Sequence, residues 1–129
     1  MEIVSDTSAF LAVALNEVDR DWIIDKTPDT NIMAPEILPY EIGKALIAVQ
    51  RKGRLNDREI FRAFEISQNI AVKLVSINIY DALKIAVRFN IYAYDAYYIQ
   101  CCLENKLSLL SLDNGMCDVA RQLGIKVVA

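Results

Sequence analysis

Histidine is absent from this sequence of 129 residues. Without an imidazole, the chain by itself has no Ser-His-Asp or Cys-His catalytic arrangement, no His-ligated zinc site and no histidine for acid/base catalysis. Carboxylates are then the leading candidates for any chemistry, and the sequence contains 17 aspartate and glutamate residues.

Long apolar stretches are also missing. The longest uninterrupted one covers residues 9–15, whereas a membrane-spanning helix needs about 18 apolar residues. The sequence starts with Met1 and Glu2, so it lacks the basic segment that opens a secretory signal peptide. These features predict a cytoplasmic protein without a membrane span.

Cysteine is scarce, with three residues, which is an odd number. Cys101 and Cys102 are adjacent within an apolar pattern and would point to different sides of a helix. This arrangement favours reduced, packed cysteines over a disulfide framework or a zinc site.

The apolar share of 54% and the charged share of 24% are typical of globular proteins. We therefore expect a single domain over residues 1–129, of a size that suits a homodimer.

Charge is low overall but uneven along the chain. The net charge of −3 argues against nucleic-acid binding through bulk positive charge. Residues 1–41 carry a net charge of −7, however, and residues 42–62 carry +4. Four of the basic residues in the second segment are candidates for holding an RNA backbone, and they are Lys44, Arg51, Lys52 and Arg54. A solvated helical face is the alternative interpretation of the same charges.

Strand patterns alternate with helix patterns along the sequence. Strands are predicted over residues 2–5, 32–34, 72–75, 107–111 and 125–128, and helices over 9–15, 17–25, 36–51, from 56 onward, 80–88, 95–104 and 114–123. Asn56 with Glu59 resembles a capping box, and Gly53 separates two helices that form a hairpin. The alternation predicts an α/β fold, with a central parallel sheet covered by helices on both faces.

Four carboxylates occupy positions that suit a site. Asp6 and Asp113 each follow a predicted strand, and the carboxyl ends of parallel strands are where ligands bind in such folds. Glu41 and Asp95 each fall on the apolar side of a predicted helix, so we expect both to point toward the core. The alternative for Asp6 and Asp113 is that each only caps the helix that it precedes.

Buried carboxylates need protonation, a partner or a cation, because an isolated buried charge costs several kcal/mol. No lysine or arginine shares the predicted helical faces of Glu41 and Asp95. Oxygen ligands alone suit Mg²⁺ or Mn²⁺, which often bridge protein carboxylates to substrate phosphates. The pattern therefore predicts a divalent metal ion. Asp81 and Asp118, by contrast, lie with basic residues on polar helix faces and are expected to be solvated.

Four short segments together resemble the PIN domain family, in particular VapC-type toxins of toxin–antitoxin pairs. They are Ile3-Val4-Ser5-Asp6-Thr7-Ser8, Pro39-Tyr40-Glu41-Ile42-Gly43-Lys44-Ala45-Leu46, Tyr94-Asp95-Ala96-Tyr97-Tyr98 and Leu110-Ser111-Leu112-Asp113. The resemblance implies a three-layer α/β/α sandwich and a metal-dependent endoribonuclease that uses Asp6, Glu41, Asp95 and Asp113. Ser8 and Ser111 match the family's serine or threonine positions, and they are expected to hydrogen-bond the carboxylates. Asn114 stands where some relatives carry a further acid, which puts a second metal ion in doubt.

The resemblance also implies partners, namely an RNA substrate, a small antitoxin protein and a second copy of the chain. The helical hairpin and the Tyr97-Tyr98 pair are candidate surfaces for the antitoxin, and core or dimer packing is the alternative for both. A solitary PIN nuclease in RNA processing and a non-catalytic PIN-fold module that binds RNA or protein remain as alternatives. Receiver domains and haloacid-dehalogenase phosphatases fit less well, because Ser5 and Ser8 stand where those proteins need a second acid beside Asp6.

Overall fold

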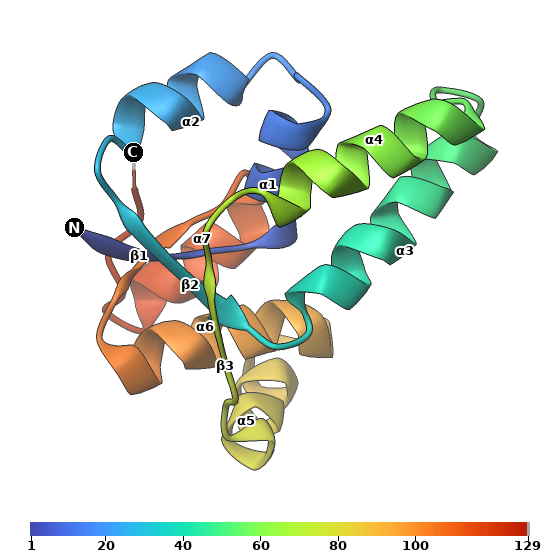
Figure 1. The fold of residues 1–129 in the computed structure, drawn as a ribbon. Coiled ribbons are helices and arrows are strands. Elements are labelled where there is room, and N and C mark those ends of the chain that lie inside the picture. The colour runs from blue at the N-terminus through green and yellow to red at the C-terminus, as the bar shows by residue number, and fades with distance from the viewer. Residues whose placement is uncertain (129) are drawn as a thin grey trace.

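The computed structural model describes residues 1–128 and contains a four-stranded parallel sheet (Figure 1). The strands are β1 (Glu2–Ser5), β2 (Asn31–Pro35), β3 (Lys73–Val75) and β4 (Ser108–Leu110). Their order across the sheet is β3-β2-β1-β4. Because every pair is parallel, each connection crosses over the sheet and contains at least one helix. The predicted parallel sheet is confirmed.

Seven helices connect and surround these strands within the described part of the chain (Figure 1). They are α1 (Thr7–Ala14), α2 (Arg20–Lys26), α3 (Leu38–Arg51), α4 (Asp57–Gln68), α5 (Ile79–Phe89), α6 (Ala93–Asn105) and α7 (Asn114–Gln122). Each corresponds to a helix expected from the sequence, with ends displaced by a few residues. No helix within residues 1–128 is long and apolar enough to span a membrane.

The central strand β1 supplies the core on both sides of the sheet. Ile3 and Val4 are both fully buried, as expected for a central strand of a parallel sheet covered on two faces. Ile3 packs in a cluster with Ile23 from α2 and with residues of α1, whereas Val4 belongs to the larger cluster that includes Ile99 of α6. Alternate residues of β1 therefore face different helical layers. This confirms the three-layer α/β/α sandwich.

Helices α3 and α4 form the predicted hairpin, which extends away from the sheet (Figure 1). Gly53 follows α3 with a φ of 76°, a conformation that glycine adopts without a steric penalty. The side chain of Asn56 accepts a hydrogen bond from the Glu59 backbone N–H at 2.9 Å, and Glu59 accepts one from the Asn56 N–H at 3.1 Å. This reciprocal pair is the capping box that the sequence predicted at the start of α4.

The predicted strand over residues 125–128 is wrong, because only one bridge, between Leu109 and Val127, forms there. Leu109 N–H donates to the Lys126 carbonyl at 2.9 Å, and Val128 N–H donates to the Leu109 carbonyl at 2.9 Å. Alternate residues of a strand direct their backbone groups to opposite neighbours. In the three-residue β4 the outward-facing position is Leu109, so the edge supports a bridge but no ladder.

All three cysteines are buried and unpaired, in agreement with the packing role expected from the sequence. Burial raises the pKa of the Cys101 thiol to about 12 and also raises that of Cys102. A thiol with a raised pKa is a poor nucleophile and a poor metal ligand at neutral pH. The cysteines are therefore poor candidates for catalysis or metal binding.

Candidate active site

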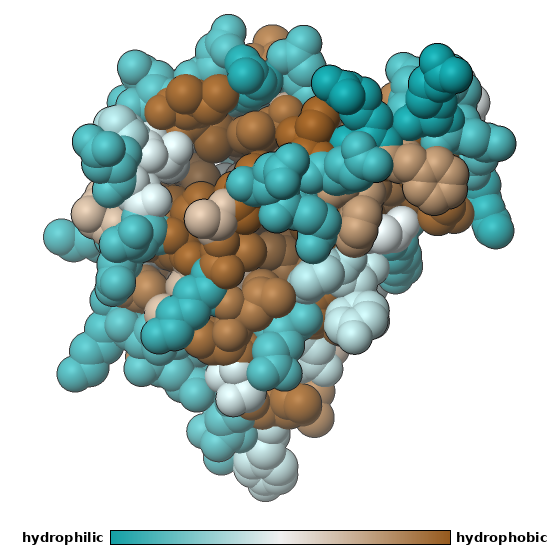
Figure 2. All heavy atoms as spheres, in the orientation of Figure 1, coloured by the Kyte–Doolittle hydropathy of each residue, from teal (hydrophilic) through white to brown (hydrophobic). Residues whose placement is uncertain are grey.

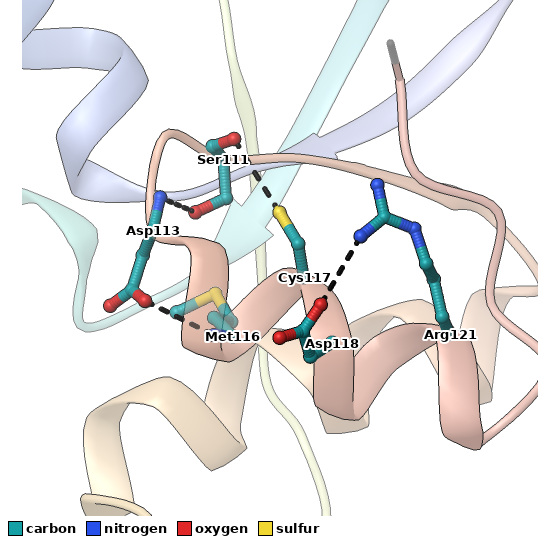
Figure 3. Close-up of polar contacts among 6 residues, drawn as sticks. All are labelled: Ser111, Asp113, Met116, Cys117, Asp118 and Arg121. Atoms are coloured by element: carbon teal, nitrogen blue, oxygen red, sulfur yellow. Dashed lines mark hydrogen bonds and ion pairs between the residues drawn. The ribbon is translucent and has the colours of Figure 1, made fainter.

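Asp6 and Asp113 lie at the same edge of the sheet, because they follow the neighbouring parallel strands β1 and β4. Each also caps a helix. Ala9 N–H donates to Asp6 Oδ1 at 3.2 Å at the start of α1, and Met116 N–H donates to Asp113 Oδ1 at 3.1 Å at the start of α7 (Figure 3). The two interpretations of these residues are compatible, since the two oxygens of a carboxylate carry about four lone pairs, and capping a helix uses only one of them.

Asp6 is the most deeply buried of the four predicted carboxylates, with 4% of its surface exposed. Burial raises the pKa of Asp6, hydrogen bonds from Ser111 and Ser8 oppose that rise, and the negative charge of Asp113 adds to it. Ser8 Oγ donates to Asp6 Oδ1 at 2.7 Å, and Ser111 Oγ donates to Asp6 Oδ2 at 2.5 Å. The side chain is therefore held in one orientation and is solvated by hydroxyl groups instead of water.

The two serines also tie separate segments of the chain together. Leu112 N–H donates to Ser8 Oγ at 3.0 Å. Asp113 N–H donates to Ser111 Oγ at 3.0 Å, as Figure 3 shows. Each hydroxyl thus accepts from the loop between β4 and α7 while donating to Asp6. The start of α1 and the start of α7 are fixed relative to each other through the Asp6 carboxylate.

Glu41, in the first turn of α3, is linked to α1 and α6 through Thr7. Thr7 Oγ1 donates to Glu41 Oε1 at 3.1 Å, so its oxygen is left to accept from the Tyr98 hydroxyl at 3.0 Å. Tyr98 is 1% exposed, and burial raises its pKa, which keeps this hydroxyl protonated as the donor. The sequence analysis did not identify Thr7 as a site residue. Its position between Asp6 and Ser8, in a polar segment, is the feature that could have indicated it.

The negative charges of the other three carboxylates influence Asp95, which lies in the first turn of α6. Burial raises the pKa of Asp95 from 3.8 to about 6, with further increases from the negative charges of Asp113, Glu41 and Asp6. None of these four acids takes part in an ion pair with a residue of the described part of the chain. The negative charges that share this edge of the sheet therefore lack a cationic partner from the protein.

The four carboxylates differ in burial, and Glu41 and Asp95 reach the core less deeply than expected from their helical faces. Asp6 is buried, Glu41 and Asp95 are half-buried, and Asp113 is exposed. A helical wheel gives the direction of a side chain around the axis but not its depth along it. Glu41 and Asp95 lie in first turns, where their helices leave the core and solvent reaches the side chains. Further along α6, Gln100 is buried and its Nε2 donates to Glu104 Oε2 at 3.0 Å.

The donor set suits a hard divalent cation, since all four groups are carboxylates and no histidine or exposed thiol competes. The raised pKa values of Asp6 and Asp95 also mark a place where a positive charge would be stabilising. Across residues 1–128, however, no three acidic or cysteine side chains converge closely enough to hold an ion as they stand. Binding would therefore require side chains such as the exposed Asp113 to turn toward the ion.

The four basic residues proposed from the sequence fall into two separate places. Lys44 lies near the acids, with its Nζ 5.5 Å from the ring centre of Tyr94, which precedes Asp95. Arg51, Lys52 and Arg54 lie at the far end of the α3–α4 hairpin, where Figure 2 shows strongly hydrophilic side chains. Ten residues separate Glu41 from Arg51, which corresponds to about 15 Å along the helix.

The Tyr97-Tyr98 pair does not offer two side chains to a partner. Tyr98 is 1% exposed and belongs to the main core cluster. Tyr97 is half-buried and lines a surface cavity. Neighbouring residues of a helix point about 100° apart, so one ring enters the core while the next remains at the surface. The interpretation of Tyr98 as part of an antitoxin surface is therefore replaced by its role in the core.

The metal-free protein is expected to gain stability from Asp95 as the pH falls from about 7 to about 4. The folded state, with a pKa of about 6, keeps a proton that the unfolded chain, with a pKa of 3.8, has released. This contribution is complete below about pH 4 and is lost as the pH rises through 6. Because Asp95 is half-exposed, we expect on the order of 1 kcal/mol, or a few degrees in Tm.

Thermal unfolding in EDTA, with the wild type compared with Asp95→Asn, measures this contribution. The stability advantage of Asp95→Asn should be larger near pH 7 than near pH 5. Asp118→Asn, which removes an exposed carboxylate paired with Arg121, serves as the control and should show no such trend. A difference between wild type and Asp95→Asn that does not change with pH would contradict the raised pKa.

Comparison with known proteins agrees with this architecture. A family model described as PIN domain matches residues 3–122. The crystal structure of PAE2754 from Pyrobaculum aerophilum is similar, with a TM-score of 0.67 and 23% sequence identity, over 99% of this chain and 92% of that chain. At that identity the similarity shows the fold alone. No curated protein matches this chain.

Proposed function

The chain belongs to the PIN domain family, which has a nuclease fold, and from that premise we propose that it is a Mg²⁺- or Mn²⁺-dependent endoribonuclease, the toxin of a toxin–antitoxin pair. The observation that carries the metal dependence is the unbalanced negative charge at the edge of the sheet. Asp6 is buried with a raised pKa, Asp95 has a pKa raised to about 6 by burial and three acids, and neither is paired with a cation of the described residues. A divalent ion would balance those charges.

Asp6, Asp95 and Asp113 are the proposed ligands of the ion, directly or through water, and Glu41 is the proposed fourth ligand or the base that orients the attacking water. When bound, the ion would supply a more acidic water and neutralise charge on the phosphate oxygens. The protein's part is to position these groups. Ser8, which donates to Asp6 at 2.7 Å, restricts one ligand to a single orientation before the substrate arrives.

The basic residues define a proposed path for the RNA strand. Lys44 lies one helical turn after Glu41 and is exposed, so it is placed to contact a phosphate next to the one that is cleaved. Arg51, Lys52 and Arg54, about 15 Å along α3, would contact phosphates further along the same strand. This division supports a substrate of several nucleotides over a mononucleotide.

An antitoxin and a second copy of the chain are the proposed protein partners. Support for a homodimer comes from α5, where Ile79, Tyr80, Leu83 and Val87 are all more than 40% exposed and form an unusually apolar helix surface. A short upstream reading frame for a small DNA-binding protein would support the toxin. Its absence would favour a solitary PIN nuclease in RNA processing.

Incubation of the purified protein with total RNA, with Mg²⁺ and with EDTA, tests the proposed activity. We expect cleavage in Mg²⁺, restored by Mn²⁺ and abolished by EDTA, and sequencing of the cut ends would identify the cleaved sites. RNA that stays intact while Mn²⁺ binding is also absent in calorimetry would contradict the nuclease and favour a non-catalytic binding module.

A further inference from the structure

A surface cavity of about 400 Å³ opens at the carboxyl ends of β2 and β3, next to the candidate active site. Pro35 and Val75, the last residues of these strands, contribute to its walls. The cavity is also lined by Tyr40, Tyr94 and Tyr97. Its volume lies within the range of pockets that bind small organic groups. None of the carboxylate chemistry described above uses this cavity.

The tyrosines bring flat, accessible rings to the cavity. Tyr40 is 76% exposed and Tyr94 is 38% exposed, so both side chains are accessible to a ligand. The ring centres of Tyr94 and Tyr97 are 5.8 Å apart with their planes tilted by 50°. Nucleobases stack on such rings whatever their sequence, because every base has a flat face.

Two of the residues that line the cavity are next to the acids in the sequence. Tyr40 immediately precedes Glu41 in α3, and Tyr94 immediately precedes Asp95 in α6. Successive residues of a helix point about 100° apart, so each ring lies beside a carboxylate and not in front of it. Lys44, whose Nζ is 5.5 Å from the centre of the Tyr94 ring, adds a positive charge beside that ring.

We propose that this cavity binds a nucleobase of single-stranded RNA adjacent to the phosphate that is cleaved. This inference rests on the proposed ribonuclease function and adds to it a base-binding subsite beside the acids. The tyrosine rings and the aliphatic side chains of Ile37, Ile77 and Ile79 make a largely apolar wall that suits the face of a nucleobase, and Lys44 suits the phosphate attached to it. In a duplex the bases are already stacked and paired, so a site of this kind selects single strands. Glu36, which also lines the cavity, is placed to accept hydrogen bonds from exocyclic amino groups of the base.

Binding of a fluorescent, unstructured RNA oligonucleotide, followed by anisotropy in EDTA and again in Ca²⁺, tests the inference without cleavage. Tyr40→Leu and Tyr94→Leu should each weaken binding about tenfold, and Tyr94→Phe, which keeps the ring, should recover most of the affinity of Tyr94→Leu. Tyr92→Leu is the matched control, because Tyr92 is 83% exposed and does not line the cavity. Circular dichroism of each variant checks that the fold is retained.

Two further measurements identify the bound group and the reaction it serves. Replacing single nucleotides of the RNA by abasic ones should reveal one position at which the loss equals that of Tyr94→Leu, with no additional loss when both changes are combined. In Mg²⁺, Tyr94→Leu should raise KM about tenfold and change kcat less than threefold, since the ring binds the substrate without touching the reacting atoms.

The outcomes separate this inference from the proposed function. Tyrosine-dependent binding without cleavage by the wild type would overturn the nuclease and leave the nucleobase site standing. Cleavage and binding unaffected by Tyr40→Leu and Tyr94→Leu would overturn the site and leave the nuclease standing. A loss of self-association in these variants with unchanged RNA affinity would assign the cavity to an interface between copies. An absence of RNA binding by the wild type in both conditions would overturn the inference.

Discussion

Replacing Asp6 with asparagine is expected to abolish Mg²⁺-dependent RNA cleavage by this protein while leaving its fold intact. Asparagine keeps an oxygen that can accept from Ala9 N–H and cap α1, but it removes the negative charge that would hold the ion. Because even the outer partners of metal ligands cost 10–100-fold when mutated, we expect a loss of more than about a hundredfold. A gel assay of RNA cleavage at matched protein concentration measures it.

The stability of the same variant provides an independent readout. Burial raises the pKa of Asp6, so its charged form is costly in the metal-free protein. Asparagine removes that cost, but its NH2 group cannot accept from Ser111 Oγ, so the Tm of Asp6→Asn in EDTA is expected to lie within a few degrees of that of the wild type. Mn²⁺ should raise the Tm of the wild type but not that of the variant. Asp118→Asn, on the exposed side of α7, controls for the substitution and should behave as the wild type in both assays. Undiminished cleavage by Asp6→Asn would show that the assignment is wrong.

The parts of the fold that follow local rules were predictable from the sequence. Asn56 and Glu59 accept hydrogen bonds from backbone N–H groups at the start of α4. Because both residues lie within four positions of each other, the sequence alone predicts this cap. The position of Asp6 and Asp113 at one edge of the sheet was predictable because each follows an apolar strand, and parallel strands end at a common edge. That the two strands are adjacent comes from the structure. The direction of Glu41 and Asp95 around their helices followed from periodicity in the same way.

The sequence could not predict how deeply each side chain is buried or which side chains from different helices form hydrogen bonds. Glu41 was expected in the core, and it is half-exposed because α3 begins at the border of the sheet. The hydrogen bonds that connect Tyr98, Thr7 and Glu41 join three helices, and no pattern within one helix encodes them. The length of β4 depends on where the chain turns toward Asp113, and this decided against a fifth strand at residues 125–128.

Glu41 offers the sharpest test of whether the acids act as one metal site. Glu41→Gln keeps an oxygen that can accept from Thr7 Oγ1 and nearly preserves the shape of the side chain, while it removes one negative charge. If Glu41 is a ligand, Mn²⁺ binding in calorimetry and RNA cleavage should both be lost, the latter by more than about a hundredfold. Retained Mn²⁺ binding with lost cleavage would instead assign Glu41 to the orientation of the attacking water.

Thr7→Val tests whether the orientation of the Glu41 side chain matters in addition to its charge. Valine is similar in size to threonine but has no hydroxyl, so Glu41 keeps its charge and loses the hydrogen bond that fixes its orientation. We expect Mn²⁺ affinity and cleavage to fall about tenfold, and a Tm loss, because the buried Tyr98 hydroxyl loses its partner at a cost of about 1–3 kcal/mol. Thr7→Ser, which restores the hydroxyl, should recover all three properties. Cleavage and Mn²⁺ binding by Thr7→Val equal to those of the wild type would mean that Glu41 is positioned without Thr7.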